Sequence, residues 1–427
     1  MSILDCIKER MGVDDLRRYV RRTRPDVVGL QCYTFDQFNV RKMLDSVKEV
    51  RPQVITVLGG PHPTAVPDET FEFLGAGLDY AFRGEAEVGF PIFLDLLEKS
   101  SRNGDMAGVP GLVHRKDGDL IKNEKAQAED LDGLGFPAWD LIRPQDYPEA
   151  QHGAFFKNFP IAPVMATRGC PFLCTFCTSA GTAIRRRSVS HVMEEIRLLH
   201  DRFGIREFHM VDDNFTLDRE YAKEFARALI GSNLRMSWAT PNGVRLDRLD
   251  EELLRLMKES GLYIVSLGIE SGSDRVLKTM RKSLTVEKIR KNVEMVRNAG
   301  IEIGGFFVLG YPGETREDRE ATLRLALELD ILRANFFTYL PLPGTASYRE
   351  LQESGQIDRT DWERFYFMNA AWVPEGVDRK ELKRFQRKAF LLFYLRPRIV
   401  WRNLWSIQSL RHFVFLARRF YHWIVMR

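Results

Sequence analysis

The sequence predicts an α/β protein in three parts: a partial Rossmann-like domain, a partial (β/α)6 barrel of the TIM type, and a basic helical C-terminal segment. Two series of alternating strand and helix patterns, followed by a change to a basic and aromatic composition, predict this order. Short β-branched runs alternate with amphipathic stretches over 1–100 and again over 160–375, as in parallel strands joined by crossover helices. Glycines and prolines interrupt 101–159, which we expect to be a connector, and 376–427 form a basic, aromatic tail.

Length and composition narrow the class of protein. A chain of 427 residues predicts two or three domains, and 44% apolar with 29% charged residues excludes disordered, collagen-like and coiled-coil proteins. Five cysteines are too few for a disulfide scaffold. No uncharged run is long enough to cross a membrane, and the first residues do not resemble a signal peptide. We therefore expect a cytoplasmic protein.

The first βα series ends its strands in glycine. The pattern predicts strands at 26–30, 53–58 and 79–82 and helices at 41–50 and 69–74. Gly59 and Gly60 directly follow the second strand, at the carboxyl edge where ligands approach the backbone of an open α/β sheet. A tight turn without a ligand explains the two glycines equally well.

The second series predicts the barrel. Its expected strands are 163–167, 207–211, 236–240, 264–269, 304–309 and 335–340, and its expected helices are 191–201, 219–230, 251–260, 286–299 and 316–329. Six such strands form a partial relative of the eight-stranded barrel, in which ligands collect at the carboxyl ends of the strands.

Three cysteines follow the first strand of this series. Cys170, Cys174 and Cys177 have C-x3-C-x2-C spacing, and three thiols within eight residues indicate a metal site rather than core packing. Structural zinc would need a fourth ligand, and no other Cys or His lies between Gly153 and His191. Three thiolates suit a 4Fe-4S cluster with one iron open to a substrate or cosubstrate.

With four further motifs, the cysteines resemble the radical S-adenosylmethionine (SAM) superfamily, in its cobalamin-associated branch. Each motif lies at or just beyond the end of a predicted strand, and the resemblance covers about 161–374. The motifs are Asp212-Asp213-Asn214-Phe215, Gly268-Ile269-Glu270-Ser271-Gly272-Ser273, Gly310-Tyr311-Pro312-Gly313-Glu314 and Pro341-Leu342-Pro343-Gly344-Thr345.

This resemblance implies a chemistry and roles for residues. The three cysteines would bind three irons, and the fourth iron would chelate SAM, whose reductive cleavage yields a 5'-deoxyadenosyl radical. Family contacts would place the methionine ammonium at Asp212, Asp213 and Asn214, the ribose or the surroundings of the carboxylate at Glu270 and Ser271, and the adenine at the backbone of Val308, Gly310 and Tyr311. On its own, 212–214 is more typical of a solvated turn that caps a helix, and only the cysteines before it favour the cosubstrate role.

The N-terminal region is similar to the cobalamin-binding domain of the same branch. Pro25-Asp26-Val27-Val28-Gly29 and Gly59-Gly60-Pro61-His62-Pro63-Thr64 carry this similarity, which implies that Gly59 and Gly60 lie at the cobalamin. The D-x-H-x-x-G motif with its axial histidine does not occur. Ser2-Ile3-Leu4-Asp5-Cys6 resembles the second strand of such a domain, so we expect the first strand and helix to be missing. Either cobalamin binds without a histidine ligand, or the domain is a cobalamin-free scaffold.

The C-terminal segment differs in composition from the rest of the chain. From Leu382 to Arg427 there are eleven Lys or Arg, eleven aromatic residues and no Asp or Glu. A helical stripe is predicted for Leu382, Phe385, Gln386, Ala389, Leu392 and Phe393. Two interpretations remain open: the helices cap the barrel, or 382–427 contacts an anionic membrane or a lipid-like substrate. Nucleic acid is not expected, because the remainder is net acidic.

Together, the residues and the resemblance predict a radical SAM enzyme. It would transfer a methyl group to a hydrophobic metabolite, or cyclise or rearrange one, since the family's methyltransferases and its anaerobic magnesium-protoporphyrin monomethyl ester cyclase are not separated by these motifs. The implied partners are a small hydrophobic substrate and a one-electron reductase such as flavodoxin or ferredoxin. The alternatives are a cobalamin-free radical enzyme and an iron–sulfur electron carrier, although a carrier has no need of the cosubstrate motifs.

Overall fold

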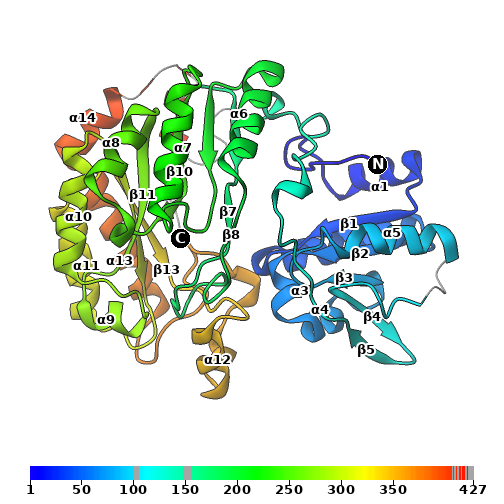
Figure 1. Cartoon of the computed structure of the whole chain (residues 1–427). Helices are drawn as coiled ribbons and strands as arrows, with labels where there is room; N and C mark the ends of the chain where they lie inside the picture. The colour runs from blue at the N-terminus through cyan, green and yellow to red at the C-terminus, as the bar shows by residue number, and fades with distance from the viewer. Residues whose placement is uncertain are drawn as a thin grey trace. The chain divides into compact units, whose positions relative to one another are not determined.

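The computed structural model describes residues 1–100, 105–147 and 156–405, with 407, 410, 413–414, 416–418 and 421. The chain forms two compact α/β units, coloured along the chain in Figure 1. The first contains Met1–Gly135, Pro341–Gln356 and Asp361–Phe365; the second contains Phe136–Leu340, Ile357–Thr360 and Tyr366–Arg427.

The first unit is built on a five-stranded sheet in the order β1-β2-β3-β4-β5. β1, β2 and β3 are parallel, whereas β4 pairs antiparallel with β3 and forms a hairpin with β5. The strands are β1 Val27–Gln31, β2 Ile55–Gly59, β3 Tyr80–Phe82, β4 Leu112–Lys116 and β5 Asp119–Lys122. The helices are α1 Val13–Thr23, α2 Gln37–Val50, α3 Pro61–Ala65, α4 Pro67–Leu74, α5 Gly89–Ser100 and, from the later segment, α12 Ala346–Glu353.

Side chains of β2 point alternately to the two faces of this sheet, and helices cover both faces. Leu58 packs with Leu44 of α2 and Phe71 of α4, while Val57 on the opposite face packs with Phe93 of α5. The three predicted strands are therefore confirmed as neighbouring parallel strands, with β2 buried between the other two. The hairpin of β4 and β5 lies in the expected connector 101–159 and was not foreseen.

The start of the chain differs from its prediction. Residues 2–6 form no strand, and β1 is the edge strand of the sheet, so the similarity to a second strand was wrong. The Asp5 carboxylate accepts hydrogen bonds from the backbone N–H groups of Ile7 and Lys8, both at 2.9 Å, which closes a turn instead.

A late segment of the chain completes the first unit. Following the second unit's last strand, Pro341–Gln356 belongs to the first unit and contains α12. Gly344, at φ +85°, comes so near α3 that a Cβ on it would lie 3.0 Å from the Cβ of Ala65. The Pro341-to-Thr345 motif thus packs on the helix that follows Gly59 and Gly60.

The second unit contains a six-stranded parallel sheet in the order β6-β9-β10-β11-β12-β13. Each crossover joins neighbouring strands, and β6 and β13 are the open edges, as expected for a partial (β/α)6 barrel. The strands are β6 Ile161–Val164, β9 Glu207–Met210, β10 Ser237–Val244, β11 Leu262–Glu270, β12 Glu302–Leu309 and β13 Arg333–Thr338. A small antiparallel pair, β7 Thr167–Arg168 and β8 Arg185–Arg186, follows β6.

Helices follow the strands and bury one face of the sheet. They are α6 Val189–Phe203, α7 Arg219–Gly231, α8 Glu251–Glu259, α9 Asp274–Thr279, α10 Val286–Asn298 and α11 Arg316–Glu328. Ile303, Phe307 and Leu309 of β12 enter the core with these helices, so Phe306 and Val308 lie on the inner face of the sheet. All six strand predictions and all five helix predictions are confirmed to within a few residues at their ends.

The described part of the tail forms α13 Arg379–Tyr394 and α14 Pro397–Trp405. Leu382, Ala389 and Phe393 are buried in the barrel core, which confirms the helix and most of its stripe. Leu392 was placed wrongly on that stripe: it is 46% exposed, and Phe390 is buried instead. Residues beyond Trp405 lie largely outside the described part of the chain. No helix among the described residues has the length and apolar character that a membrane crossing requires.

Candidate active site

The three cysteines lie on a closed loop after β6. β7 and β8 pair at its base, and Cys170 and Thr182 close it further: the Cys170 N–H donates to Thr182 Oγ1 (2.9 Å) and the Thr182 N–H donates to the Cys170 carbonyl (3.0 Å). Gly169 at φ +92° permits this closure, because a Cβ there would lie 2.2 Å from the carbonyl oxygen of Ala183. The predicted metal-binding segment is therefore a tight, pre-shaped loop.

The thiols share one environment. Cys174 is buried, while Cys170 and Cys177 are half-buried. The pKa of Cys177 is raised to about 11, mainly by burial and to a smaller extent by the nearby Cys174 and Cys170. No three His, Cys, Asp or Glu side chains in the described residues are grouped tightly enough for a single metal ion. A 4Fe-4S cluster needs a wider arrangement, since each thiolate binds a different iron, and three soft sulfur donors suit it.

Two cations flank Cys174. Arg245, just after β10, has Nη1 at 3.8 Å from Cys174 Sγ. Lys282, after α9, is buried and has Nζ at 2.7 Å from Glu270 Oε1. Burial raises the pKa of the Cys174 thiol, whereas the charges of Lys282 and Arg245 lower it. The two positive charges thus offset part of the effect of burial, and the pKa of Cys174 remains above its ordinary value.

Asp212 and Asp213 turn toward the loops before them. Asp212 is buried and accepts from the N–H groups of Ala166 (2.9 Å) and Thr167 (2.7 Å) and from Thr167 Oγ1 (2.7 Å). Burial raises its pKa to about 7, and these hydrogen bonds oppose the rise. Asp213 is exposed and accepts from the Ser179 hydroxyl (2.9 Å) in the cysteine loop. Asp212 therefore positions the start of the cysteine loop, and Asp213 remains accessible.

Asn214 has a different environment from the two aspartates. Its side chain is 1% exposed, and neither Oδ1 nor Nδ2 has a hydrogen-bond partner among the described residues. A buried amide without partners costs about 1–3 kcal/mol, so such a group indicates an interaction that a bound molecule completes. Asn214 is therefore a candidate to bind a ligand or an ordered water beside the cysteine loop.

Glu270 and Ser271 end β11 in different ways. Glu270 adopts φ +63°, a left-handed conformation that is unfavourable for a non-glycine residue, and pairs with Lys282. Ser271 is fully buried, and its hydroxyl lies 3.2 Å from Thr322 Oγ1 of α11. Ser271 is thus part of the support beneath the site, whereas Glu270 lies beside the cations near Cys174.

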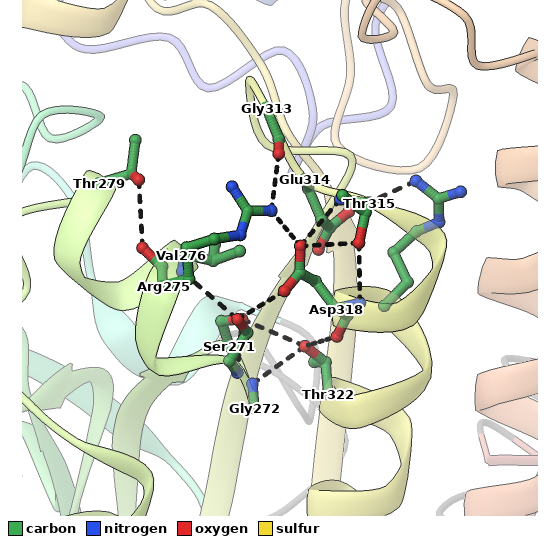
Figure 2. Close-up of polar contacts among 12 residues, drawn as sticks. Ser271, Gly272, Arg275, Val276, Thr279, Gly313, Glu314, Thr315, Asp318 and Thr322 are labelled. Carbon is green, nitrogen blue, oxygen red and sulfur yellow. Dashed lines mark hydrogen bonds and ion pairs between the residues drawn. The ribbon is translucent and has the colours of Figure 1, made fainter.

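Figure 2 shows the polar network that ties the turn after β11 to α11. Asp318 is its centre: it accepts from the hydroxyl of Ser273 (2.6 Å) and the N–H of Thr315 (2.9 Å), and forms an ion pair with Arg275. Arg275 also donates to the Gly313 carbonyl (2.8 Å). The hydrogen bonds from Ser273, Thr315 and Arg275 hold the pKa of Asp318 near 2 against the opposing effect of burial. The turns after β11 and β12 are therefore locked together.

The turn after β12 has a buried acid and a buried phenol. The Gly310 N–H donates to Glu314 Oε2 at 2.5 Å, and Gly310 itself adopts φ +74°. Tyr311 is buried with its hydroxyl 2.6 Å from Thr175 Oγ1, so it contacts the cysteine loop directly. Val308 remains half-buried on the inner face of the sheet. The structure thus brings this turn and the cysteine loop together at the carboxyl end of the barrel.

Comparisons with known proteins agree with this geometry. The family model for the radical SAM superfamily matches residues 164–326, and the model for the B12 binding domain matches residues 1–94. An uncharacterised methyltransferase of Pyrococcus horikoshii is 30% identical over 98% of this chain and 88% of its own length. This chain belongs to the radical SAM superfamily. Within the superfamily it belongs to the branch that has a B12-binding domain.

Other relatives of this radical SAM enzyme have named reactions. Cytidylyl-2-hydroxyethylphosphonate methyltransferase of Streptomyces wedmorensis is 33% identical over 81% of this chain and 70% of its own. The anaerobic magnesium-protoporphyrin IX monomethyl ester cyclase of Rubrivivax gelatinosus is 27% identical over 91% and 71%. Among solved structures, the cobalamin-dependent SAM radical enzyme OxsB has a TM-score of 0.71 at 14% identity, over 95% of this chain and 64% of that one. This structural likeness shows the fold.

The cofactors of the radical SAM enzyme are a 4Fe-4S cluster, SAM and cobalamin. At the carboxyl edge of the first unit's sheet, Gly59 has open space beside its Cα, as an approaching ligand requires. Gly60 serves the fold instead, because a Cβ there would lie 2.8 Å from the Cys32 carbonyl. His62 is buried with Nδ1 at 3.2 Å from Thr34 Oγ1, and burial lowers its pKa to about 4. This edge therefore suits cobalamin bound without His62 as a ligand.

Sequence reasoning missed Arg245, Lys282 and Asp318. None lies in a recognised motif, and each is one charged residue among many in a 29% charged chain. The usable signal was position alone: Arg245 comes directly after β10, at the strand end where ligands gather in such barrels.

Proposed function

We propose that this chain is a cobalamin-dependent radical SAM methyltransferase in which Cys170, Cys174 and Cys177 bind the 4Fe-4S cluster. The observation that carries the proposal is three thiols on one closed loop beside Asn214, whose buried amide lacks a partner among the described residues. Methyl transfer is favoured over cyclisation because the relatives at 30% and 33% identity are both methyltransferases by name.

Each part of the site has a proposed task. When bound, the cluster supplies the electron that cleaves SAM. Asp213 and Asn214 hold the methionine ammonium, since carboxylate and amide oxygens accept its hydrogen bonds. Glu270 is held by Lys282 where it can reach the ribose or the carboxylate end of SAM. The backbone from Val308 through Gly310 to Tyr311 receives the adenine, while Asp212 and Ser271 position these loops.

We propose a hydrophobic substrate because apolar side chains on the inner face of the barrel are partly accessible. Phe306 and Phe337 lie with ring centroids 5.9 Å apart on neighbouring strands, both half-buried. Val308 is half-buried on the same face, and Met165 is 37% exposed just after β6. Apolar side chains that stay accessible at the carboxyl half of a barrel are available to an apolar small molecule.

Anaerobic reconstitution tests the proposal. The protein is loaded with iron and sulfide and incubated with SAM, dithionite and hydroxocobalamin, and 5'-deoxyadenosine and co-eluting corrinoid are measured. We expect both. Deoxyadenosine without corrinoid would redirect the assignment to a cobalamin-free radical enzyme, and iron-loaded protein that forms no deoxyadenosine would contradict it.

The physiological electron donor is proposed to be flavodoxin or ferredoxin. Half-buried Cys170 and Cys177 and the 60% exposed Leu173 place the cysteine loop at the surface of its unit, where a small donor protein can approach. Reduced flavodoxin should therefore replace dithionite in the deoxyadenosine assay. A Leu173→Glu variant should lower the flavodoxin-driven rate several-fold and leave the dithionite-driven rate unchanged. Equal loss of both rates would show damage to the site instead.

We also propose that α14 and the tail rest on an anionic lipid surface, giving the cytoplasmic enzyme a membrane-peripheral location. Trp401 and Trp405 are 62% and 74% exposed on one face of α14, and residues 382–427 of the tail include no Asp or Glu. Replacing both tryptophans with Ala should reduce sedimentation with phosphatidylglycerol vesicles. Tyr366→Ala, an exposed aromatic outside the tail, is the matched control. Unchanged vesicle binding by the double variant would contradict the membrane contact and favour the interpretation that these helices only cap the barrel.

A further inference from the structure

Arg245 is the most constrained cation near the cysteine loop. Its guanidinium is 8% exposed, pairs with Asp247 (Nε to Oδ1, 2.9 Å) and donates from Nη2 to the Lys282 carbonyl (2.8 Å). The guanidinium carbon also lies 3.6 Å from the ring centroid of Phe172, between the first two cysteines. These three partners, in three separate loops, fix its position. Such a guanidinium costs too much to bury for packing alone.

A further N–H of this guanidinium points at a sulfur. Nη1 lies 3.8 Å from Cys174 Sγ, within the range of an N–H···S hydrogen bond. Neither Cys170 nor Cys177 has a hydrogen bond from an arginine in the described residues. Cys174 is therefore distinguished from the other two thiols by a fixed positive donor.

We infer that Arg245 is a positioning residue that donates a hydrogen bond to the Cys174 thiolate and sets the reduction potential of the bound cluster. The inference rests on the proposed function, because it takes Cys174 to be a cluster ligand. One-electron reduction, with the electron from the external donor, takes the cluster from the 2+ to the 1+ state and adds one negative charge to the site. A fixed cation and a hydrogen bond to the sulfur stabilise the reduced state more than the oxidised state. Arg245 consequently raises the potential and eases reduction.

Asp247 allows a test of the direction in which Arg245 shifts the reduction potential. Its carboxylate is 27% exposed and partly neutralises Arg245, so removing the negative charge leaves Arg245 more effective. Arg245→Gln and Asp247→Asn should therefore shift the potential in opposite directions. General loosening of the loop would shift both variants in the same direction.

Arg248 provides a matched control. Its guanidinium carbon lies over the same Phe172 ring at 5.2 Å, but no hydrogen bond joins it to a cysteine. Arg248→Gln thus removes a neighbouring cation from the same ring without removing a donor to sulfur.

The experiment is an anaerobic redox titration of the reconstituted full-length protein, monitored by the EPR signal of the reduced cluster, with iron content measured for every variant. We expect a more negative midpoint for Arg245→Gln, a more positive one for Asp247→Asn, and no resolved shift for Arg248→Gln. Unchanged midpoints in both test variants at full iron content, or shifts of the same sign, would overturn the inference. If Arg245→Gln binds no iron, Arg245→Lys replaces it in the test. We then expect a more negative midpoint for Arg245→Lys and a more positive midpoint for Asp247→Asn. Failure of the unmodified protein to bind iron would instead overturn the proposed function.

Discussion

The cysteine loop after β6 and the turns after β11 and β12 lie at the same end of the barrel but satisfy their polar groups differently. The cysteine loop carries three free thiols, and the buried Asn214 amide near it has no hydrogen-bond partner among the described residues. In the two turns, Asp318 has partners from Ser273, Thr315 and Arg275. Both regions are therefore shaped by the chain itself, but of the two only the cysteine loop has beside it a buried side chain, that of Asn214, whose polar atoms all lack a partner among the described residues.

Cys174→Ala gives the largest expected effect, because it removes the buried thiol that we propose as a ligand of the cluster. We expect complete loss of the brown cluster absorbance and of 5'-deoxyadenosine formation, with thermal stability of the apoprotein little changed. Cys6→Ala, at a half-buried cysteine outside the loop, is the matched control and should retain both. If Cys174→Ala still formed 5'-deoxyadenosine at an unchanged iron count, Cys174 would not be a cluster ligand.

Asp318→Ala tests the turns after β11 and β12. Loss of three partners at a largely buried carboxylate should cost about 2–4 kcal/mol of unfolding free energy. Urea unfolding of the apoprotein measures this cost. Glu317→Ala, the neighbouring exposed acid, should cost much less. A cost for Asp318→Ala below that of Glu317→Ala would show that the network does not hold the turns.

Asn214→Ala should have opposite effects on folding and on binding. Removing an amide without partners relieves a buried polar group, so apoprotein stability should be unchanged or raised. Binding of SAM to the cluster-loaded protein should weaken about tenfold, which corresponds to about 1.4 kcal/mol. Equilibrium dialysis with labelled SAM checks the affinity. Lower apoprotein stability together with unchanged affinity would assign Asn214 to the core.

The smallest expected effect is the acid dependence of the network. The folded-state pKa of Asp318 is near 2, below its ordinary value of 3.8, so its contribution is present above pH 4 and is lost as the pH falls toward 2. After allowance for solvent screening this amounts to roughly 1 kcal/mol. Asp318→Asn should flatten that part of the stability–pH curve relative to the unmodified protein. Identical curves would mean that the carboxylate is not charged in the fold.

The sequence was informative where a periodic pattern or a motif specified the structure. Alternating apolar residues predicted β11 and β12, and the cysteine spacing predicted the loop. Which carboxylate faces the site could not be predicted, because Asp212 and Asp213 are adjacent and identical in chemistry. Their difference arises from long-range contacts, the bonds of Asp212 to Ala166 and Thr167. Arg245 was missed for the same reason: its partners, Cys174 and the Lys282 carbonyl, lie 71 and 37 residues away.

The late segment of the first unit has a consequence for synthesis. Pro341–Gln356 and Asp361–Phe365 leave the ribosome only after all six strands of the second unit's sheet have been made. The first unit is therefore completed only after the second unit's sheet, and until then the surface of α3 beside Ala65 lacks the turn at Gly344. A gene fragment that ends at Gly135 would encode this domain without its final helix, so exchange of the cobalamin-binding unit between relatives requires two grafted segments.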